Sequence, residues 1–197
     1  MSGIKVAVLI LAGALSWSCG QLGKVDQGRV VAFDGNQGLL TLVRESDVKN
    51  SKEPRYDVLP PVTVFVPRDP EQMGPFPEAG KLMEFDLEHS VLVVFDSGRQ
   101  SFRRIGFSLI HQEHNVSMRD RRVAGKQFPV LDPTSGTITI YSPWQRLLAK
   151  ISVAGEYWNL PEDTWRFGDE VRYYYKDRRH ALRMMNVTKT DINQSTG

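Results

Sequence analysis

Residues 111–114 bring together three side chains of types that bind metal ions. His111 and His114 form a His-x-x-His pair, and Glu113 lies beside them. Imidazole nitrogens and carboxylate oxygens are zinc ligands in proteins, but a complete site needs three or four of them. Because the pair follows a predicted strand, we expect exposed loop histidines here. A metal-dependent enzyme at His111 and His114 is the weaker alternative.

Other patterns that indicate catalysis are missing from the sequence. It contains no Gly-x-Ser-x-Gly elbow, no glycine-rich phosphate loop and no Cys-x-x-Cys-His attachment site for haem. Pairs of acidic residues such as Glu84 with Asp86 are typical of exposed strands. The sequence therefore favours a non-enzymatic protein and predicts no cofactor.

Aromatic and basic residues lie close together in the second half of the chain. In one predicted strand, Tyr174 shares the outward face with Arg172 and Lys176. Trp158 and Trp165 flank the loop before that strand. Small barrels bind oligosaccharides by stacking them on such aromatics, so these five residues form the candidate ligand surface. The alternative is that the tryptophans and tyrosines fill a small core, with their polar tips reaching solvent.

Cys19 is the single cysteine among 197 residues. An apolar run from Val6 to Leu15 precedes it. This run has signal-peptide length and is too short for a transmembrane helix of about 20 residues. The position of Cys19 predicts a lipid-attachment site after a signal peptide of residues 1–18. Trp17 stands where a small residue is usual, so ordinary cleavage and secretion is the alternative.

The composition is that of an ordinary globular protein. Hydrophobic residues make up 41% of the chain, which is enough for a core, and charged residues make up 24%. The formal net charge of +2 does not predict nucleic-acid binding. A single cysteine allows no disulfide within the chain.

The chain after the signal peptide alternates between apolar and polar residues with a period of two. This pattern, rich in β-branched and aromatic residues, is typical of half-buried strands. We expect an all-β fold with little helix apart from the signal peptide. The clearest alternating sets are Val62, Val64 and Val66; Leu147, Ala149, Ile151 and Val153; and Val171, Tyr173 and Tyr175.

A weak internal repeat predicts two tandem units. The hairpin sequence at 28–43 resembles that at 125–141, and each is followed by a strand, a Pro-Glu loop and a further hairpin. Five short antiparallel strands per unit indicate small OB-like or SH3-like barrels, because closure removes exposed strand edges. The alternative is that short hairpins simply resemble one another. The expected order is a signal peptide (1–18), a first barrel with an extra strand (19–117), a basic connecting loop (118–124), a second barrel (125–190) and a tail (191–197).

One predicted strand, Val91–Phe95, is apolar on both faces. A barrel strand with a solvated outer face would alternate, so the outer face of this strand must also be covered. We therefore expect the two units to pack together as one rigid body.

Several segments resemble an uncharacterised family of small lipoproteins from sulfate-reducing bacteria. The resemblance implies export and lipidation but assigns no activity. It covers nearly the whole mature chain and is carried by residues 23–30 (GKVDQGRV), 58–62 (VLPPV), 69–75 (DPEQMGP) and 181–191 (ALRMMNVTKTD).

Together these observations predict a non-enzymatic lipoprotein of the bacterial cell envelope, anchored through Cys19 and facing the periplasm. It would act as a binding or assembly module for protein partners, with no nucleic-acid partner. A carbohydrate- or peptidoglycan-binding protein that uses the second-half aromatics is the alternative, as is a soluble periplasmic or secreted location.

Overall fold

The computed structural model describes residues 22–46 and 54–190, and these residues form an all-β fold of two sheets. The described helical elements are one turn of α-helix, α1 (Pro70–Met73), and two 3₁₀ turns, η1 (Gly155–Asn159) and η2 (Glu162–Trp165). None of the helices in the described ranges is long and apolar enough to cross a membrane. The strands are β1 (Lys24–Asp34), β2 (Leu39–Glu45), β3 (Tyr56–Phe65), β4 (Leu82–Asp86), β5 (Val91–Asp96), β6 (Ser101–Glu113), β7 (Val130–Asp132), β8 (Thr137–Ser142), β9 (Leu147–Val153), β10 (Glu170–Asp177) and β11 (His180–Asn186).

The first sheet is a closed barrel of five strands in the order β1-β10-β11-β3-β2. Its seam between β11 and β3 is parallel and is registered at His180 and Phe65. The alternation predicted from the sequence places Val171, Tyr173 and Tyr175 inside the barrel, where they form its core together with residues of the other strands. The buried residues of this core are Val30, Leu40, Leu42, Val64, Met73, Val171, Tyr173, Tyr175, Ala181 and Met184.

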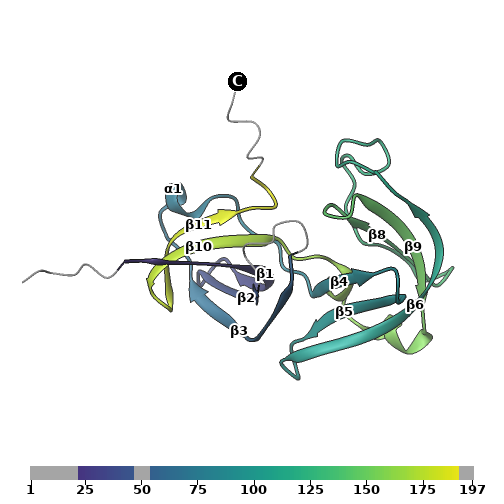
Figure 1. Ribbon diagram of the computed structural model, residues 1–197, viewed down its shortest axis with the longest axis horizontal. Helices are drawn as coiled ribbons and strands as arrows, with labels where there is room; N and C mark the ends of the chain where they lie inside the picture. The colour runs from purple at the N-terminus through teal and green to yellow at the C-terminus, as the bar shows by residue number, and fades with distance from the viewer. Residues whose placement is uncertain (1–21, 47–53, 191–197) are drawn as a thin grey trace, which may run out of the picture.

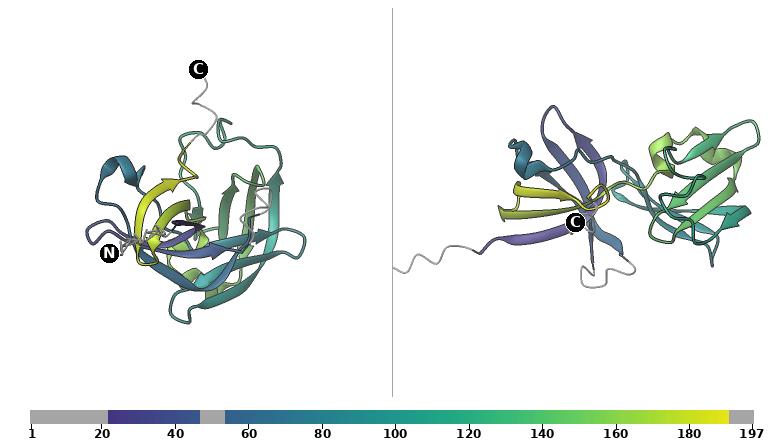
Figure 2. Two further views of the ribbon diagram at one scale, coloured as in Figure 1. Left: turned by 60° about the vertical axis from the view of Figure 1, so that its left-hand side comes forward. Right: turned by 90° about the horizontal axis from the view of Figure 1, so that it is seen from above.

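The second sheet has six strands in the order β4-β5-β6-β9-β8-β7. All six come from the chain between α1 and β10, so this sheet is an insertion between the third and fourth strands of the barrel. Its core is rich in leucine and isoleucine and is capped by the indole of Trp165, which is 1% exposed. Figure 1 shows the barrel on the left and the inserted sheet on the right, and the right-hand view of Figure 2 shows them side by side from above.

The strands are not divided in tandem as the internal repeat predicts. Strand β1 pairs with β10, so the two ends of the described chain close a single barrel. The expected first unit (19–117) and second unit (125–190) each contribute strands to both sheets. The expected connecting loop (118–124) instead joins β6 to β7 within the inserted sheet. The repeated hairpins are real strands, but local resemblance carries no information about which distant strands pair.

The doubly apolar strand β5 has both of its faces covered, as predicted. Leu92 and Val94 point into the core of the inserted sheet. Phe95, with Val93 beside it, faces the outside of the barrel and packs against a separate apolar cluster. In that cluster Val31, Val43 and Tyr56 come from the barrel, whereas Met83 and Phe95 come from the inserted sheet. The buried apolar contact therefore joins the two sheets.

The two chain segments that connect the sheets also pack closely against each other. The amide of Gly80 donates a 3.0 Å hydrogen bond to the carbonyl of Val30, and the amide of Val30 donates a 2.9 Å bond to the carbonyl of Asp169. A Cβ atom on Gly80 would overlap the carbonyl oxygen of Arg166, and one on Gly168 would overlap that of Val30. Glycine is required at both positions because the backbones touch.

Candidate functional site

A buried arginine lies at the contact between the barrel and the inserted sheet. Arg29 is on the outer face of β1 and is 4% exposed. Its Nη1 atom donates to the carbonyl oxygens of Leu82 (3.1 Å) and Met83 (2.7 Å) in β4. Its guanidinium carbon lies 4.1 Å from the ring centroid of Tyr56 and 4.9 Å from that of Phe167. Arg29 therefore binds the two sheets together through hydrogen bonds and cation–π contacts.

A set of buried polar side chains surrounds Arg29. The hydroxyl of Tyr56 donates a hydrogen bond to Glu170. The amide nitrogen of Gln27 donates to Glu170 (2.6 Å) and to Glu45 (2.8 Å), and its amide oxygen accepts from the Nε of Arg172 (2.7 Å). We call Gln27, Arg29, Glu45, Tyr56 and Glu170 the polar joint.

Within the polar joint, the guanidinium of Arg29 is attracted by the carboxylates of Glu45 and Glu170. Burial lowers the pKa of Arg29, and the charges of Tyr56, Glu170 and Glu45 oppose that shift. Burial raises the pKa of Tyr56 well above its usual value, and the neighbouring carboxylate of Glu170 raises it further. Each member is almost fully removed from solvent, so the joint stabilises the structure and offers no surface to a ligand.

The polar joint is not predicted by the sequence alone. The one sequence signal for the joint is Arg29 itself, a charged residue that directly precedes the apolar residues Val30 and Val31. Because alternate residues of a half-buried strand face solvent, an arginine at that position indicated an ordinary exposed side chain. The cover that buries it comes from β4, more than 50 residues away in the chain.

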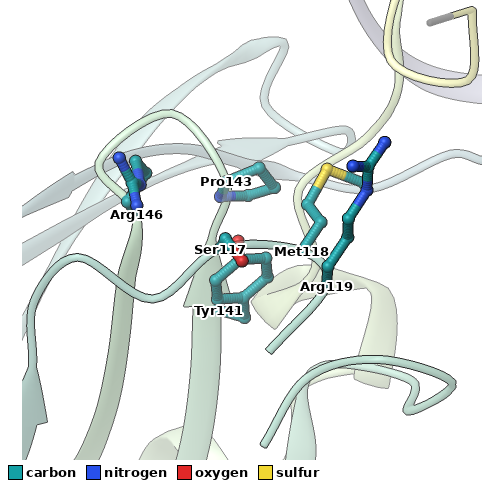
Figure 3. Close-up of a pocket in the computed structure, with 6 residues that line it drawn as sticks. All are labelled: Ser117, Met118, Arg119, Tyr141, Pro143 and Arg146. Carbon is teal, nitrogen blue, oxygen red and sulfur yellow. The ribbon is translucent and has the colours of Figure 1, made fainter. Parts of the chain in front are cut away.

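An open hollow lies at the far end of the inserted sheet, next to the long connection between β6 and β7. Its volume is about 530 Å³, and it lies between that connection and the turn from β8 to β9. Arg146 stands on one side and Met118 with Arg119 on the other, with Tyr141 and Pro143 between them (Figure 3). We call the hollow lined by Ser117, Met118, Arg119, Tyr141, Pro143 and Arg146 the distal hollow.

Hydrogen bonds fix the walls of the distal hollow. The hydroxyl of Tyr141 donates to the carbonyl of Val116 (3.0 Å), and the amide of Val116 donates to the carbonyl of Arg146 (2.8 Å). Close by, Arg122 is held between the carboxylates of Asp120 and Glu113. The ring of Tyr141 and the backbone of Val116 and Arg146 are therefore held in place beneath the exposed side chains of the hollow.

Two large apolar side chains are exposed on the segments that border the distal hollow. Met118 is 59% exposed, and Trp144, in the β8–β9 turn, is 50% exposed. Tryptophan, methionine and arginine are enriched where proteins bind one another. Met118, Trp144 and Arg146 thus give this end of the inserted sheet the composition of a protein-binding surface.

A second exposed surface lies on the barrel. The outward residues of β10 are Arg172, Tyr174 and Lys176, as the sequence predicts. Arg183 is registered beside Tyr174, and Met185 beside Arg172. On the other side Val25 of β1 is registered with Tyr174, whose ring covers the backbone of Gly23. We call the surface formed by Val25, Arg172, Tyr174, Lys176, Arg183 and Met185 the basic barrel face.

The five predicted ligand-contact residues do not form one surface. Arg172, Tyr174 and Lys176 lie on the barrel. Trp165 is buried in the core of the inserted sheet, and Trp158 packs against the same core. The expectation that both tryptophans contact a ligand is therefore corrected for Trp165, whose indole fills the core because the sheet needs a large apolar group there.

His111 lies in β6 and not in a loop as expected, whereas His114 directly follows the strand. His111 is exposed, and its Nε2 atom is 3.3 Å from a carboxylate oxygen of Glu113. Within residues 22–46 and 54–190, no three His, Cys, Asp or Glu side chains are grouped closely enough to hold a metal ion. Cys19 and the signal peptide (1–18) lie outside the described residues.

Comparison with protein families matches residues 21–195 to a domain of unknown function, DUF4881. The chain belongs to the DUF4881 family. The match includes every described strand of the DUF4881 domain, so the barrel and the inserted sheet are one family unit. It confirms the resemblance to an uncharacterised family. No curated protein and no solved structure matches the chain.

Proposed function

We propose that this protein is a non-enzymatic lipoprotein of the bacterial cell envelope that tethers a binding module to a membrane. Acylated Cys19 is the anchor, and the barrel, which we assign as OB-like from its five strands and the parallel pairing of β11 with β3, is the base. The inserted sheet carries the surface for a protein partner. An unmodified N-terminus with a soluble periplasmic location is the alternative.

The observation that carries this proposal is the placement of the distal hollow. Strand β1 begins on the side of the barrel away from the inserted sheet, whereas the β6–β7 connection rises from the inserted sheet at the upper right of Figure 1. Buried apolar contacts and the polar joint couple the two sheets. A chain anchored at its N-terminus would therefore present the hollow away from the membrane.

The lining of the hollow selects the chemistry of the partner. Arg146 and the exposed side chain of Met118 line the hollow, and Trp144, in the bordering β8–β9 turn, is 50% exposed. Guanidinium groups bind carboxylates in a bidentate geometry. The expected partner is an envelope protein with an acidic segment that also carries an apolar side chain.

Two measurements test the proposal. Intact-mass analysis of the protein from membranes should give a mature chain that starts at an acylated Cys19. A photo-crosslinking amino acid at Trp144 should join one defined envelope protein in cells, and the additional change Arg146→Glu should abolish that product.

The same crosslinker at Glu88, an exposed position in the β4–β5 turn, is the control. Equal products from Glu88 and Trp144, or no product from Trp144, would contradict the partner surface. A mature N-terminus without lipid would contradict the anchor.

A further inference from the structure

The basic barrel face combines positive charge with exposed apolar side chains. Arg172, Lys176 and Arg183 supply the charge. Val25 is 55% exposed and Met185 is 40% exposed. The nearest acidic residue of the adjoining turn, Asp177, is bound to His180 at 2.7 Å and accepts from the amide of Arg179. Cations therefore dominate this surface.

The strand register makes the face continuous. Val25, Tyr174 and Arg183 form one row across β1, β10 and β11. Arg172 and Met185 form the next row on the same side of the sheet. The side chains of both rows point away from the barrel core, so charged and apolar groups reach solvent together.

The face also lies where the chain enters the barrel. Lys24 is the first residue of β1, and the ring of Tyr174 covers Gly23. Five residue steps separate Cys19 from Lys24, and an extended chain spans at most about 3.6 Å per residue. An acylated Cys19 would keep Lys24 within roughly 18 Å of the lipid surface. This short tether lets the face approach the headgroups to within the Debye length of about 8 Å over which their attraction acts in physiological salt.

We propose that the basic barrel face lies on anionic lipid headgroups and so fixes the orientation of the tethered protein. This inference rests on the proposed lipid anchor for its short tether, but the face itself is defined without it. Each lysine or arginine near an anionic bilayer strengthens binding about five-fold. Val25, Met185 and the ring of Tyr174 are placed to enter the headgroup layer, as amphipathic surfaces do.

The first experiment uses the mature chain without lipid, residues 20–197, which contains both sheets in full. Co-sedimentation with phosphatidylglycerol vesicles and with phosphatidylcholine vesicles measures the lipid preference. We expect clear binding to phosphatidylglycerol alone, which weakens steeply as salt is raised. The double variant Lys176→Glu, Arg183→Glu should bind at least about 30-fold more weakly, since losing two attractions alone gives that factor and the two new carboxylates add repulsion.

A matched variant, Arg104→Glu with Lys126→Glu, changes the net charge by the same amount on the inserted sheet, where both side chains are exposed. It should bind as the unchanged chain does. Equal loss in both variants would show a response to net charge alone and would overturn the proposal, as would binding that does not distinguish the two lipids. Circular dichroism and thermal unfolding check that all variants are folded.

The second experiment tests orientation in the acylated protein. A fluorescent label on Arg178→Cys, at the β10–β11 turn, should be quenched by quenchers attached to lipid headgroups, and a label on Ser135→Cys, in the inserted sheet, should not. Equal quenching would overturn the proposed orientation even where the lipid anchor is confirmed by mass. If the mature protein carries no lipid but still binds phosphatidylglycerol vesicles, the anchor is refuted and the lipid-binding role of the basic barrel face is still supported.

Discussion

Gly168 packs so closely against Val30 that a Cβ atom on Gly168 would overlap the carbonyl oxygen of Val30. That carbonyl also accepts the hydrogen bond from Gly80. The point at which the chain leaves the barrel and returns to it is thus a contact between backbones, and it leaves no room for side chains.

The change Gly168→Ala should therefore destabilise the protein by about 3 kcal/mol, because the added methyl group meets rigid backbone. Urea denaturation of the mature chain measures the loss. The control is Gly106→Ala in β6, where nothing lies within 4 Å of the added atom, and its stability should be unchanged or slightly higher. Equal stabilities of the two variants would show that the backbones can separate at little cost.

Replacing Arg29 with methionine tests the polar joint. Methionine keeps the apolar length but leaves the carbonyls of Leu82 and Met83 without their donor and Glu170 without its buried countercharge. Breaking such an arrangement costs about 3 to 5 kcal/mol. Arg104→Met, at an exposed position of β6, should change the free energy of unfolding by less than about 0.5 kcal/mol. A stable Arg29→Met variant would assign the coupling of the sheets to apolar contacts alone.

Alkaline pH should destabilise the protein. Burial raises the pKa values of Tyr56 and Tyr173 in the folded state. The unfolded chain loses these protons near pH 10 and the folded chain keeps them, so stability is complete below pH 10 and falls above it. Each buried tyrosine contributes a slope of about 1.4 kcal/mol per pH unit.

Denaturation between pH 8 and 11.5 measures the alkaline slope. Tyr56→Phe should reduce the slope of the free energy of unfolding against pH by about 1.4 kcal/mol per pH unit. The variant's own stability at pH 8 is the reference. A parallel titration of tyrosine absorbance should show late ionisation that coincides with unfolding. An unchanged slope in Tyr56→Phe would mean that Tyr56 ionises in the folded protein.

The apolar contact between the sheets should make them unfold together. Phe95 is almost fully buried between the barrel and the inserted sheet. We expect one calorimetric transition for the unchanged protein and two for Phe95→Ala, with a loss of about 3 to 5 kcal/mol at the contact. Phe76→Ala, at an exposed position, should leave one transition. Two transitions in the unchanged protein would refute the coupling.

The sequence was sufficient to predict individual strands. Period-two alternation placed Val171, Tyr173 and Tyr175 inside correctly, because side chains of a strand point alternately to its two faces. The same logic identified Val91–Phe95 as covered on both sides, since an outer face in water would not be apolar.

The pairing of distant strands could not be predicted in this way. The contact between β1 and β10 joins Gln27 to Arg172, which are 145 residues apart, and no local pattern specifies such a partner. The candidate surface was predicted in part for a related reason. The outward face of Tyr174 follows from alternation, but a tryptophan such as Trp165 suits a core and a surface equally well until its neighbours are known.

The insertion of one sheet into the barrel has a consequence for the order of folding. The inserted sheet is built from a single stretch of chain, residues 82–153, and can form from contacts between neighbouring strands. The barrel cannot close until β10 and β11 are present, because β1 pairs with β10. Long-range pairing of this kind slows folding. The first three strands therefore keep one unpaired edge until nearly the whole chain is available to fold. C-terminal truncation should leave a folded inserted sheet attached to an open barrel.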